Sequence, residues 1–291
     1  MVIENRQLDV ADLSELQDER WLEITTRLSC RVGCSYCPQT TFVSAYRKGG
    51  HPATELSLDT FRECLGRVPR DVAIVFAGFA EPWLNKGCTE MVRHAVRRGH
   101  EVRAYTTCVG MTDSDAAALG QLPLARLYVH LPSNAPSGMH LDVDDEYLGI
   151  LDQLTHQLAE SVAFIYHQGS GPHPLVTQLL ERHGRDAVQW AVHSRAGHLQ
   201  TPPPRSLVGG AVRCGQGREQ KNVLLPDGSV ALCCMDWGLE HVLGNLLAQE
   251  YDELFTSAPY LELKAGLSDG TGGRLCRVCE WVESCEAPPH P

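Results

Sequence analysis

The chain has 291 residues and a formal net charge of −11 at pH 7, and no apolar run approaches the ~20 residues that a membrane-spanning helix needs. Its 12 cysteines are about 4% of the residues, which is below the level of a disulfide scaffold. Composition and charge therefore exclude a membrane-embedded protein and a small disulfide-rich one, and they argue against a nucleic-acid phosphate backbone as the general partner.

The length and the first residues indicate the organisation to expect. A chain of this length predicts about two domains, or one large domain with an appendage. The N-terminal residues have no apolar signal region, so a reducing, cytoplasmic setting is expected. Residues 1–20 are polar and acidic, carry no motif and form an expected N-terminal extension.

The first predicted strand is followed by three closely spaced cysteines, Cys30, Cys34 and Cys37. This spacing lets one loop fold its thiolates around one small inorganic core, which is the geometry that an iron-sulfur cluster needs. Three sulfurs leave one iron of a cubane open, and an open metal position can bind a substrate or cofactor. The alternatives are a zinc knuckle, a disulfide framework or separate structural thiols, but zinc sites usually add a fourth ligand and paired Cys-x2-Cys units.

Strand and helix patterns alternate over residues 21–194, the expected first domain. The predicted strands are Trp21–Thr25, Val72–Phe76, Glu101–Thr107, Arg126–His130, Ser161–Tyr166 and Ala187–Val192. The predicted helices lie near Ser57–Arg67, Thr89–Arg98, Asp113–Leu119, Asp145–Ala159 and Pro174–Arg182. This order predicts an α/β fold with a parallel sheet, although periodicity alone fits a doubly wound sheet equally well. The cysteine loop lies at the carboxyl end of the first strand, where parallel folds bind ligands.

Further candidate residues follow the next strands. Gly78 and Glu81 come after the second strand, where a glycine lets backbone approach a ligand closely. Alone, Glu81 would more often be a solvated glutamate in a turn. Cys108 ends the third strand and places a thiol near the expected mouth of the site. His130 and Ser133 end the fourth, where a lone histidine is more often structural than catalytic.

A boundary is expected at residues 195–213, whose prolines and paired glycines predict a linker. Residues 214–291 would form the second domain. Within it, Asn222–Leu225 and Ser229–Leu232 flank the turn Pro226-Asp-Gly228 and predict a β-hairpin.

The second domain carries its own cysteines. Cys214 and Cys233 stand singly, and Cys276 and Cys279 form a Cys-x2-Cys pair. Two single cysteines and one pair can close four ligands around one metal centre. A zinc ribbon would normally show two such pairs, so an iron-sulfur cluster is favoured over zinc. Cys285 could replace one of these ligands or stand free.

The spacing of Cys30, Cys34 and Cys37, with Tyr36 directly before the third cysteine, resembles the radical S-adenosylmethionine (AdoMet) superfamily. The resemblance implies a partial (βα)6 barrel. It implies that the three cysteines hold a 4Fe-4S cluster whose open iron chelates the amino and carboxylate groups of AdoMet. It also implies that Tyr36 lies beside the adenine.

Two later segments extend this resemblance. Gly78-Phe-Ala-Glu81 resembles the Gly-Gly-Glu element of the family, with departures at Phe79 and Ala80. By this resemblance, Glu81 and the backbone near Gly78 receive the amino group of AdoMet. Ser133 would offer a polar group to the ribose or the substrate.

The tail resembles the twitch and SPASM extensions of radical AdoMet enzymes, in which a hairpin and a helix carry auxiliary clusters. A full SPASM domain would continue with a further Cys-x3-Cys, but position 289 is a proline. The resemblance therefore implies the twitch form, with one auxiliary 4Fe-4S cluster held by Cys214, Cys233, Cys276 and Cys279.

The function implied by the resemblance is hydrogen abstraction from an unactivated carbon by AdoMet chemistry. It needs an electron donor such as flavodoxin or ferredoxin and no nucleic-acid or membrane partner. The compact form most resembles twitch-type enzymes of aminoglycoside and other sugar or cyclitol pathways, which dehydrogenate or epimerise a carbinol carbon. A cationic aminosugar would suit the acidic chain. A ribosomal-peptide maturase and a cluster-bearing protein without turnover are the alternatives.

The remaining thiols bear on the reaction outcome. In an epimerase one thiol returns hydrogen to the opposite face of the substrate, and in a dehydrogenase the auxiliary cluster takes the electron. We predict Cys108, then Cys285, then Cys234 as candidate hydrogen donors, of which at most one acts. Cys64 and Cys88 lie in or beside predicted helices and are expected to be buried apolar groups. Epimerisation is therefore favoured narrowly over dehydrogenation.

Overall fold

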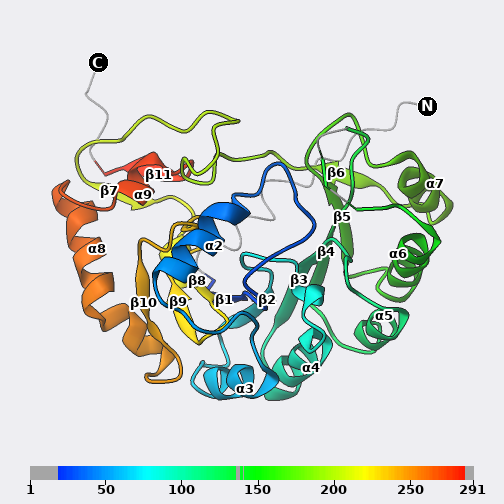
Figure 1. Ribbon diagram of the computed structural model, residues 1–291, viewed down its shortest axis with the longest axis horizontal. Helices are drawn as coiled ribbons and strands as arrows, with labels where there is room; N and C mark the ends of the chain where they lie inside the picture. Colours follow the sequence, from blue (N-terminus) through cyan, green and yellow to red (C-terminus); the bar gives the residue numbers. More distant parts are fainter. Residues whose placement is uncertain (1–18, 136–137, 140, 286–291) are drawn as a thin grey trace.

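The computed structural model describes residues 19–135, 138–139 and 141–285, so the expected N-terminal extension lies almost wholly outside the described residues. A nine-stranded sheet runs through the centre of the molecule (Figure 1). Its six consecutive parallel strands are β1 (Trp21–Ile24), β2 (Ala73–Phe76), β3 (Val102–Thr106), β4 (Arg126–His130), β5 (Val162–Tyr166) and β6 (Ala187–Gln189). They are neighbours in chain order, as right-handed crossover connections predict.

Five helices connect these strands and pack on one face of the sheet: α3 (Leu58–Gly66), α4 (Cys88–Arg98), α5 (Asp113–Leu119), α6 (Asp145–Gln157) and α7 (Pro174–Arg182). They form an outer arc around the strands in Figure 1. Local sequence starts them, since the Ser57 hydroxyl caps α3 and Thr112 forms a capping box with Asp115 at the start of α5. Because these helices share one face, the sheet is the wall of a partial barrel rather than a doubly wound sheet.

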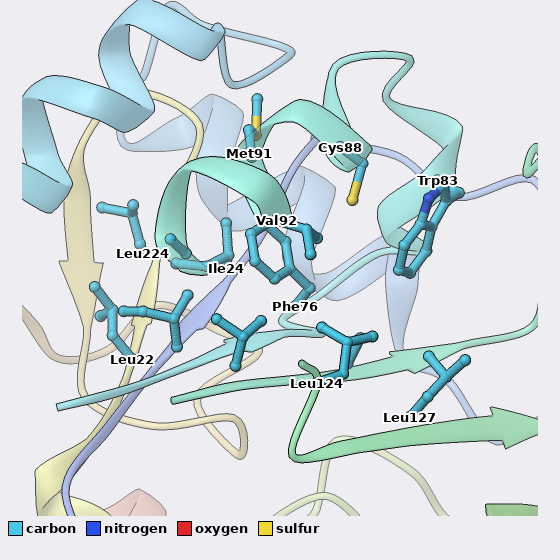
Figure 2. Packing of buried hydrophobic residues seen from close by; sticks show 14 of the residues in the cluster. Leu22, Ile24, Phe76, Trp83, Cys88, Met91, Val92, Leu124, Leu127 and Leu224 are labelled. Atoms are coloured by element: carbon cyan, nitrogen blue, oxygen red, sulfur yellow. The ribbon is translucent and has the colours of Figure 1, made fainter. Parts of the chain in front are cut away.

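Alternate strand residues point to opposite faces of the sheet. Leu22, Ile24 and Phe76 pack beneath the helices against residues such as Val92, as Figure 2 shows. Full burial of a side chain of this size contributes about 1.5–3 kcal/mol. Residues between them, such as Glu23, point into the concave interior of the barrel.

The C-terminal part extends the same sheet. Strand β8 (Lys221–Leu224) pairs in parallel with β1, and β9 (Ser229–Ala231) and β10 (Val242–Asn245) follow it as antiparallel strands. A separate two-stranded sheet consists of β7 (Val212–Cys214) and β11 (Val282–Ser284). The remaining elements are α8 (Ala258–Asp269), α9 (Arg274–Val278) and the short 3-10 helices η1 (Pro82–Leu84), η2 (Arg218–Gln220) and η3 (Tyr251–Thr256).

One helix that the sequence did not predict, α2 (Gln39–Lys48), lies on the other face of the sheet. Its Phe42 and Tyr46 are fully buried against Phe79, Val223 and Trp237. This cluster seats the cysteine loop, which directly precedes α2, against the inner face of β8.

The predicted α/β partial barrel with a C-terminal hairpin and helix is confirmed. Each predicted strand and helix of the barrel is present with small differences at its ends, and the largest among the strands is β6, which stops at Gln189. The boundary at residues 195–213 stays a prediction. Strand β8, which lies beyond it in the chain, pairs directly with β1 of the barrel sheet. Within the described part of the chain, none of the helices has the length and apolar character to span a bilayer.

Candidate functional site

The loop between β1 and α2 brings three thiols together. The Cys37 N–H donates to the Cys34 carbonyl over 3.0 Å, and Gly33 has a φ of 62° that the tight turn requires. Burial, and then the nearby Cys37 and Cys30 thiols, together raise the pKa of the Cys34 thiol to about 12. Because these thiols influence one another electrostatically, they lie near one another in the loop at the carboxyl end of β1.

Tyr36 is buried beside this loop. Its ring centroid lies 4.7 Å from that of His167, which follows β5. Ser35 donates to Gln168 over 3.2 Å from the same turn. The loop is therefore attached to the far strands of the barrel, and Tyr36 forms part of the wall of the concave interior.

The Glu81 carboxylate has its hydrogen-bond acceptors filled by the protein. Oε1 accepts from the Thr106 hydroxyl at 2.7 Å and from the Trp83 N–H at 3.2 Å. Oε2 accepts from the N–H and hydroxyl of Thr107 at 2.6 and 2.8 Å. A carboxylate offers about four acceptor positions. Glu81 therefore ties the end of β2 to the end of β3. Its predicted role in receiving the amino group of AdoMet stays a prediction.

The glycine before Glu81 is required by close packing. Gly78 has a φ of 62°, and a Cβ there would lie 2.8 Å from the Thr25 nitrogen. The Phe79 N–H donates to the Thr25 hydroxyl over 3.1 Å. The backbone after β2 is thus held against the end of β1, next to the cysteine loop.

Ser133 lies beyond the end of β4 and is half-buried. It forms an isolated bridge with Pro172, and its hydroxyl accepts from the Ala135 N–H at 3.4 Å. The described contacts therefore give Ser133 a role in closing a loop at the rim.

A cavity lies in the C-terminal part, lined from β7, the residues after β9, α8, α9 and β11. Its lining includes all four cysteines predicted as auxiliary ligands, Cys214, Cys233, Cys276 and Cys279. Most of the other lining side chains are apolar: Leu232, Met235, Leu263, Leu267, Leu275 and Val282. Four soft sulfur ligands in a largely apolar enclosure suit an iron-sulfur cluster.

Both cysteine sets fit the groups expected at them. Among the described residues, no three His, Cys, Asp or Glu side chains lie close enough to hold a single metal ion. The loop supplies three thiols and the cavity supplies four. One set therefore suits a cluster with an open iron, and the other a fully ligated cluster.

The three candidate hydrogen donors lie in different environments. Cys108 is 2% exposed and belongs to the core beneath the outer helices. Cys285 is exposed beyond β11 and does not line the cavity of the four cysteines. Cys234 packs against the same cluster as Cys37, and its sulfur lies 3.2 Å from Nη1 of Arg218. Of these three, Cys234 alone packs beside the cysteine loop, and the predicted order Cys108, Cys285, Cys234 stays a prediction.

Several interior residues were not predicted from the sequence. Tyr105 and Tyr128 stack with centroids 4.5 Å apart, and Trp190 lies 5.6 Å from Tyr128. Glu23 is 6% exposed, and burial raises its pKa while the Arg218 guanidinium opposes this shift. The alternation of apolar residues with Arg103, Tyr105, Arg126, Tyr128 and His130 in β3 and β4 is the sequence signal that could have revealed this wall.

Arg195 is a further interior residue, in the segment predicted as a linker. It has a φ of 54°, and the next residue, Ala196, has 53°. Such left-handed conformations outside glycine are costly and collect at functional sites. The charge of Arg195 lowers the pKa values of Cys37, His167 and Cys234, so its guanidinium lies near these three side chains.

Comparison with known proteins agrees with this geometry. A family model described as an iron-sulfur cluster-binding domain, SPASM, matches residues 214–280. Comparison with curated protein sequences gives no match.

Among solved structures, BtrN in complex with AdoMet and 2-DOIA matches with a TM-score of 0.61 and 18% identity, over 90% of this chain and 93% of BtrN. SuiB of Streptococcus suis bound to precursor peptide SuiA matches with a TM-score of 0.59 and 12% identity, over 93% of this chain and 74% of SuiB. Native anSMEcpe with bound AdoMet matches with a TM-score of 0.53 and 13% identity, over 89% of this chain and 86% of anSMEcpe. The predicted resemblance to radical AdoMet enzymes with twitch or SPASM domains is confirmed, and at these identities it shows the fold.

Proposed function

We propose that the protein is a radical AdoMet enzyme that removes hydrogen from a carbinol carbon of a sugar, aminosugar or cyclitol. The observation that supports this proposal is that Cys214, Cys233, Cys276 and Cys279 line one C-terminal cavity, while three further free cysteines lie in the loop that follows β1. A 4Fe-4S cluster and AdoMet, when bound at the first set, supply a radical able to abstract such a hydrogen. The protein supplies position, enclosure and polarity.

The interior suits a polar ring. Stacked Tyr105 and Tyr128, with Trp190 beside them, offer flat surfaces on which a saturated ring can lie. Glu23 and Arg218 offer buried charge of both signs to amino and hydroxyl groups. BtrN, whose structure holds AdoMet and 2-DOIA, supports a small substrate, since this chain covers 93% of it.

We assign the outcome to epimerisation with Cys234 as the hydrogen donor. Its thiol packs against the cluster of residues that seats Cys37, so it can reach the same interior. Dehydrogenation to a ketone is the second candidate, and the four cysteines of the C-terminal cavity favour it. A centre with every position filled by thiolates leaves none for substrate and suits electron transfer.

The test is formation of 5′-deoxyadenosine by the anaerobically reconstituted protein, with flavodoxin or ferredoxin as electron donor. The panel contains 2-DOIA, other aminocyclitols, aminosugars and peptides, and a variant with Cys30, Cys34 and Cys37 changed to alanine is the blank. Turnover with a ring alcohol above this blank supports the proposal. Turnover with peptides alone would assign a peptide maturase instead, and no turnover above the blank with any compound would contradict an enzyme.

A further inference from the structure

Two histidines form a hydrogen-bonded pair in the concave interior. His130 ends β4 and His167 follows β5, and Nδ1 of His130 lies 3.0 Å from Nε2 of His167. Nδ1 of His167 lies 3.3 Å from the Trp190 carbonyl oxygen. Neither histidine has a role in the function proposed above.

The chain of contacts fixes which nitrogen carries each proton. A carbonyl only accepts, so Nδ1 of His167 is protonated and donates to Trp190. In a neutral ring Nε2 of His167 is then the acceptor, and Nδ1–H of His130 donates to it. Neutral His130 is left with a lone pair on Nε2.

Both rings are neutral near pH 7. Burial lowers the pKa of His167 to about 4, and the Arg195 guanidinium contributes. Burial also lowers the pKa of His130 well below its ordinary value, with His167 and Arg195 adding to the effect. The lone pair on Nε2 of His130 is therefore available over the physiological range.

That lone pair has no partner. Nε2 of His130 is buried without a hydrogen bond among the described residues. The ring lies 5.9 Å from Tyr105 and 6.4 Å from Trp190, centroid to centroid, on the aromatic wall of the interior. The His167 ring contacts both the His130 ring and the Tyr36 ring, so it links His130 to the cysteine loop. A buried acceptor without a donor costs stability unless a ligand supplies one.

We propose that Nε2 of His130 accepts a hydrogen bond from a hydroxyl group of the substrate, and that His167 holds it in this state. This inference rests on the proposed function, because the ring alcohol supplies the donor. The bond would orient the carbinol carbon toward the cysteine loop. It would also leave electron density on the hydroxyl oxygen, which makes the adjacent hydrogen easier to remove. His130 would thus be a catalytic residue and His167 a positioning residue.

The first test reads the tautomers directly. Protein labelled with 15N-histidine, with its clusters oxidised, is examined by 1H–15N correlation, and His130→Gln and His167→Gln spectra assign the signals. We expect Nδ1–H and an unprotonated Nε2 on both rings, and the His130 Nε2 signal should shift when 2-DOIA is added in the presence of AdoMet. A proton on His130 Nε2, or bound 2-DOIA without this shift, would overturn the inference.

The second test separates the two nitrogens by substitution. His130→Asn keeps an amide near Nδ1 and loses the acceptor at Nε2, whereas His130→Gln places an amide oxygen near the Nε2 position. Loss of one hydrogen bond to 2-DOIA should weaken its binding about tenfold in the Asn variant. The Gln variant should recover most of this loss. His183→Asn, on the outer surface between α6 and α7, is the matched control and should bind like the parent.

The outcomes distinguish this inference from the proposed function. Equal 2-DOIA affinity in the parent, Asn and Gln proteins would overturn the role of His130 while leaving the ring-alcohol substrate in place. Parent protein that makes no 5′-deoxyadenosine with any ring alcohol would overturn the proposed function itself. Iron content and AdoMet affinity, measured for each variant, show whether it has kept its fold.

Discussion

The backbone N–H of Arg218 lies 3.4 Å from the sulfur of Cys214, one of the four cysteines that line the C-terminal cavity. The guanidinium of the same residue lies 4.1 Å from the Trp281 ring centroid and is buried between this cavity and the barrel interior. A positive charge next to a cluster favours its reduced form. Arg218→Gln should therefore lower the reduction potential of the auxiliary cluster by roughly tens of millivolts.

A redox titration followed by electron paramagnetic resonance checks this shift. Arg213→Gln is the matched control, because Arg213 also lines the cavity but is largely exposed and paired with Glu283. Equal shifts of the reduction potential in the two variants would show that the contact of Arg218 with Cys214 has no special effect.

The iron content tests the two cysteine sets separately. Reconstituted protein should hold about eight irons and eight sulfides, because each set suits a cluster of four. Replacing Cys30, Cys34 and Cys37 together with alanine should leave about four of each. Cys285→Ala should retain the full content, since Cys285 is exposed outside the cavity. Zinc in the C-terminal site, or full iron in the triple variant, would contradict the assignment.

Local signals in the sequence carried most of the fold and part of the site. The alternation of strands and helices predicted the parallel sheet, and the family resemblance carried by the cysteine spacing implied the barrel. The four cysteines grouped as auxiliary ligands line one cavity. Helix α2 was missed because its buried Phe42 and Tyr46 face a hairpin that lies far away in the chain. No local pattern reports such a contact.

The role of Glu81 and the ranking of the candidate hydrogen donors both depend on where a side chain points, which the sequence does not give. Glu81 follows β2 as expected, yet its carboxylate turns toward Thr106 and Thr107. Cys108 follows the end of β3, and with a φ of 64° its side chain joins the outer core. Arg195 came from a segment whose prolines and glycines resemble a linker, and its inward direction depends on two left-handed residues.

Removing Glu81 should affect stability more than AdoMet binding. Glu81→Ala leaves the hydroxyls of Thr106 and Thr107 and two buried N–H groups without their acceptor. The loss should be about 3 kcal/mol, or a fall in Tm of about 10 °C by differential scanning calorimetry. Glu160→Ala, at an exposed position, should change Tm little. A Glu81 variant of normal Tm that binds AdoMet ten- to a hundredfold more weakly would restore the direct role in AdoMet binding.

Acid should destabilise the protein partly through His167. Its pKa is lowered from 6.5 to about 4, chiefly by burial and then by Arg195. Between these two pH values the unfolded chain is protonated at His167 and the folded chain is not. This contribution to stability is complete above pH 6.5 and is lost as the pH falls toward 4. At 1.36 kcal/mol per pH unit, about 2 kcal/mol is lost between pH 7 and 5.

Comparison of Tm at the two pH values checks this prediction. His167→Gln should remove that part of the decrease, whereas His183→Gln, which faces Asp152 on the outer helices, should retain it. An identical pH dependence in parent and His167→Gln proteins would show that His167 titrates normally in the folded state.

The fate of the substrate radical tests the role of Cys234. A thiol can return hydrogen only from the interior, where Cys234 lies beside Arg218, whereas Cys108 lies in the outer core. Turnover in deuterated water should place one deuterium at the inverted carbon, because a thiol hydrogen exchanges with solvent. Cys234→Ala should still form 5′-deoxyadenosine but no epimer, and Cys108→Ala should still form the epimer, both measured by mass spectrometry of the product. A product two hydrogens lighter and free of solvent deuterium would instead assign dehydrogenation, with Cys234 left as a neighbour of the auxiliary site.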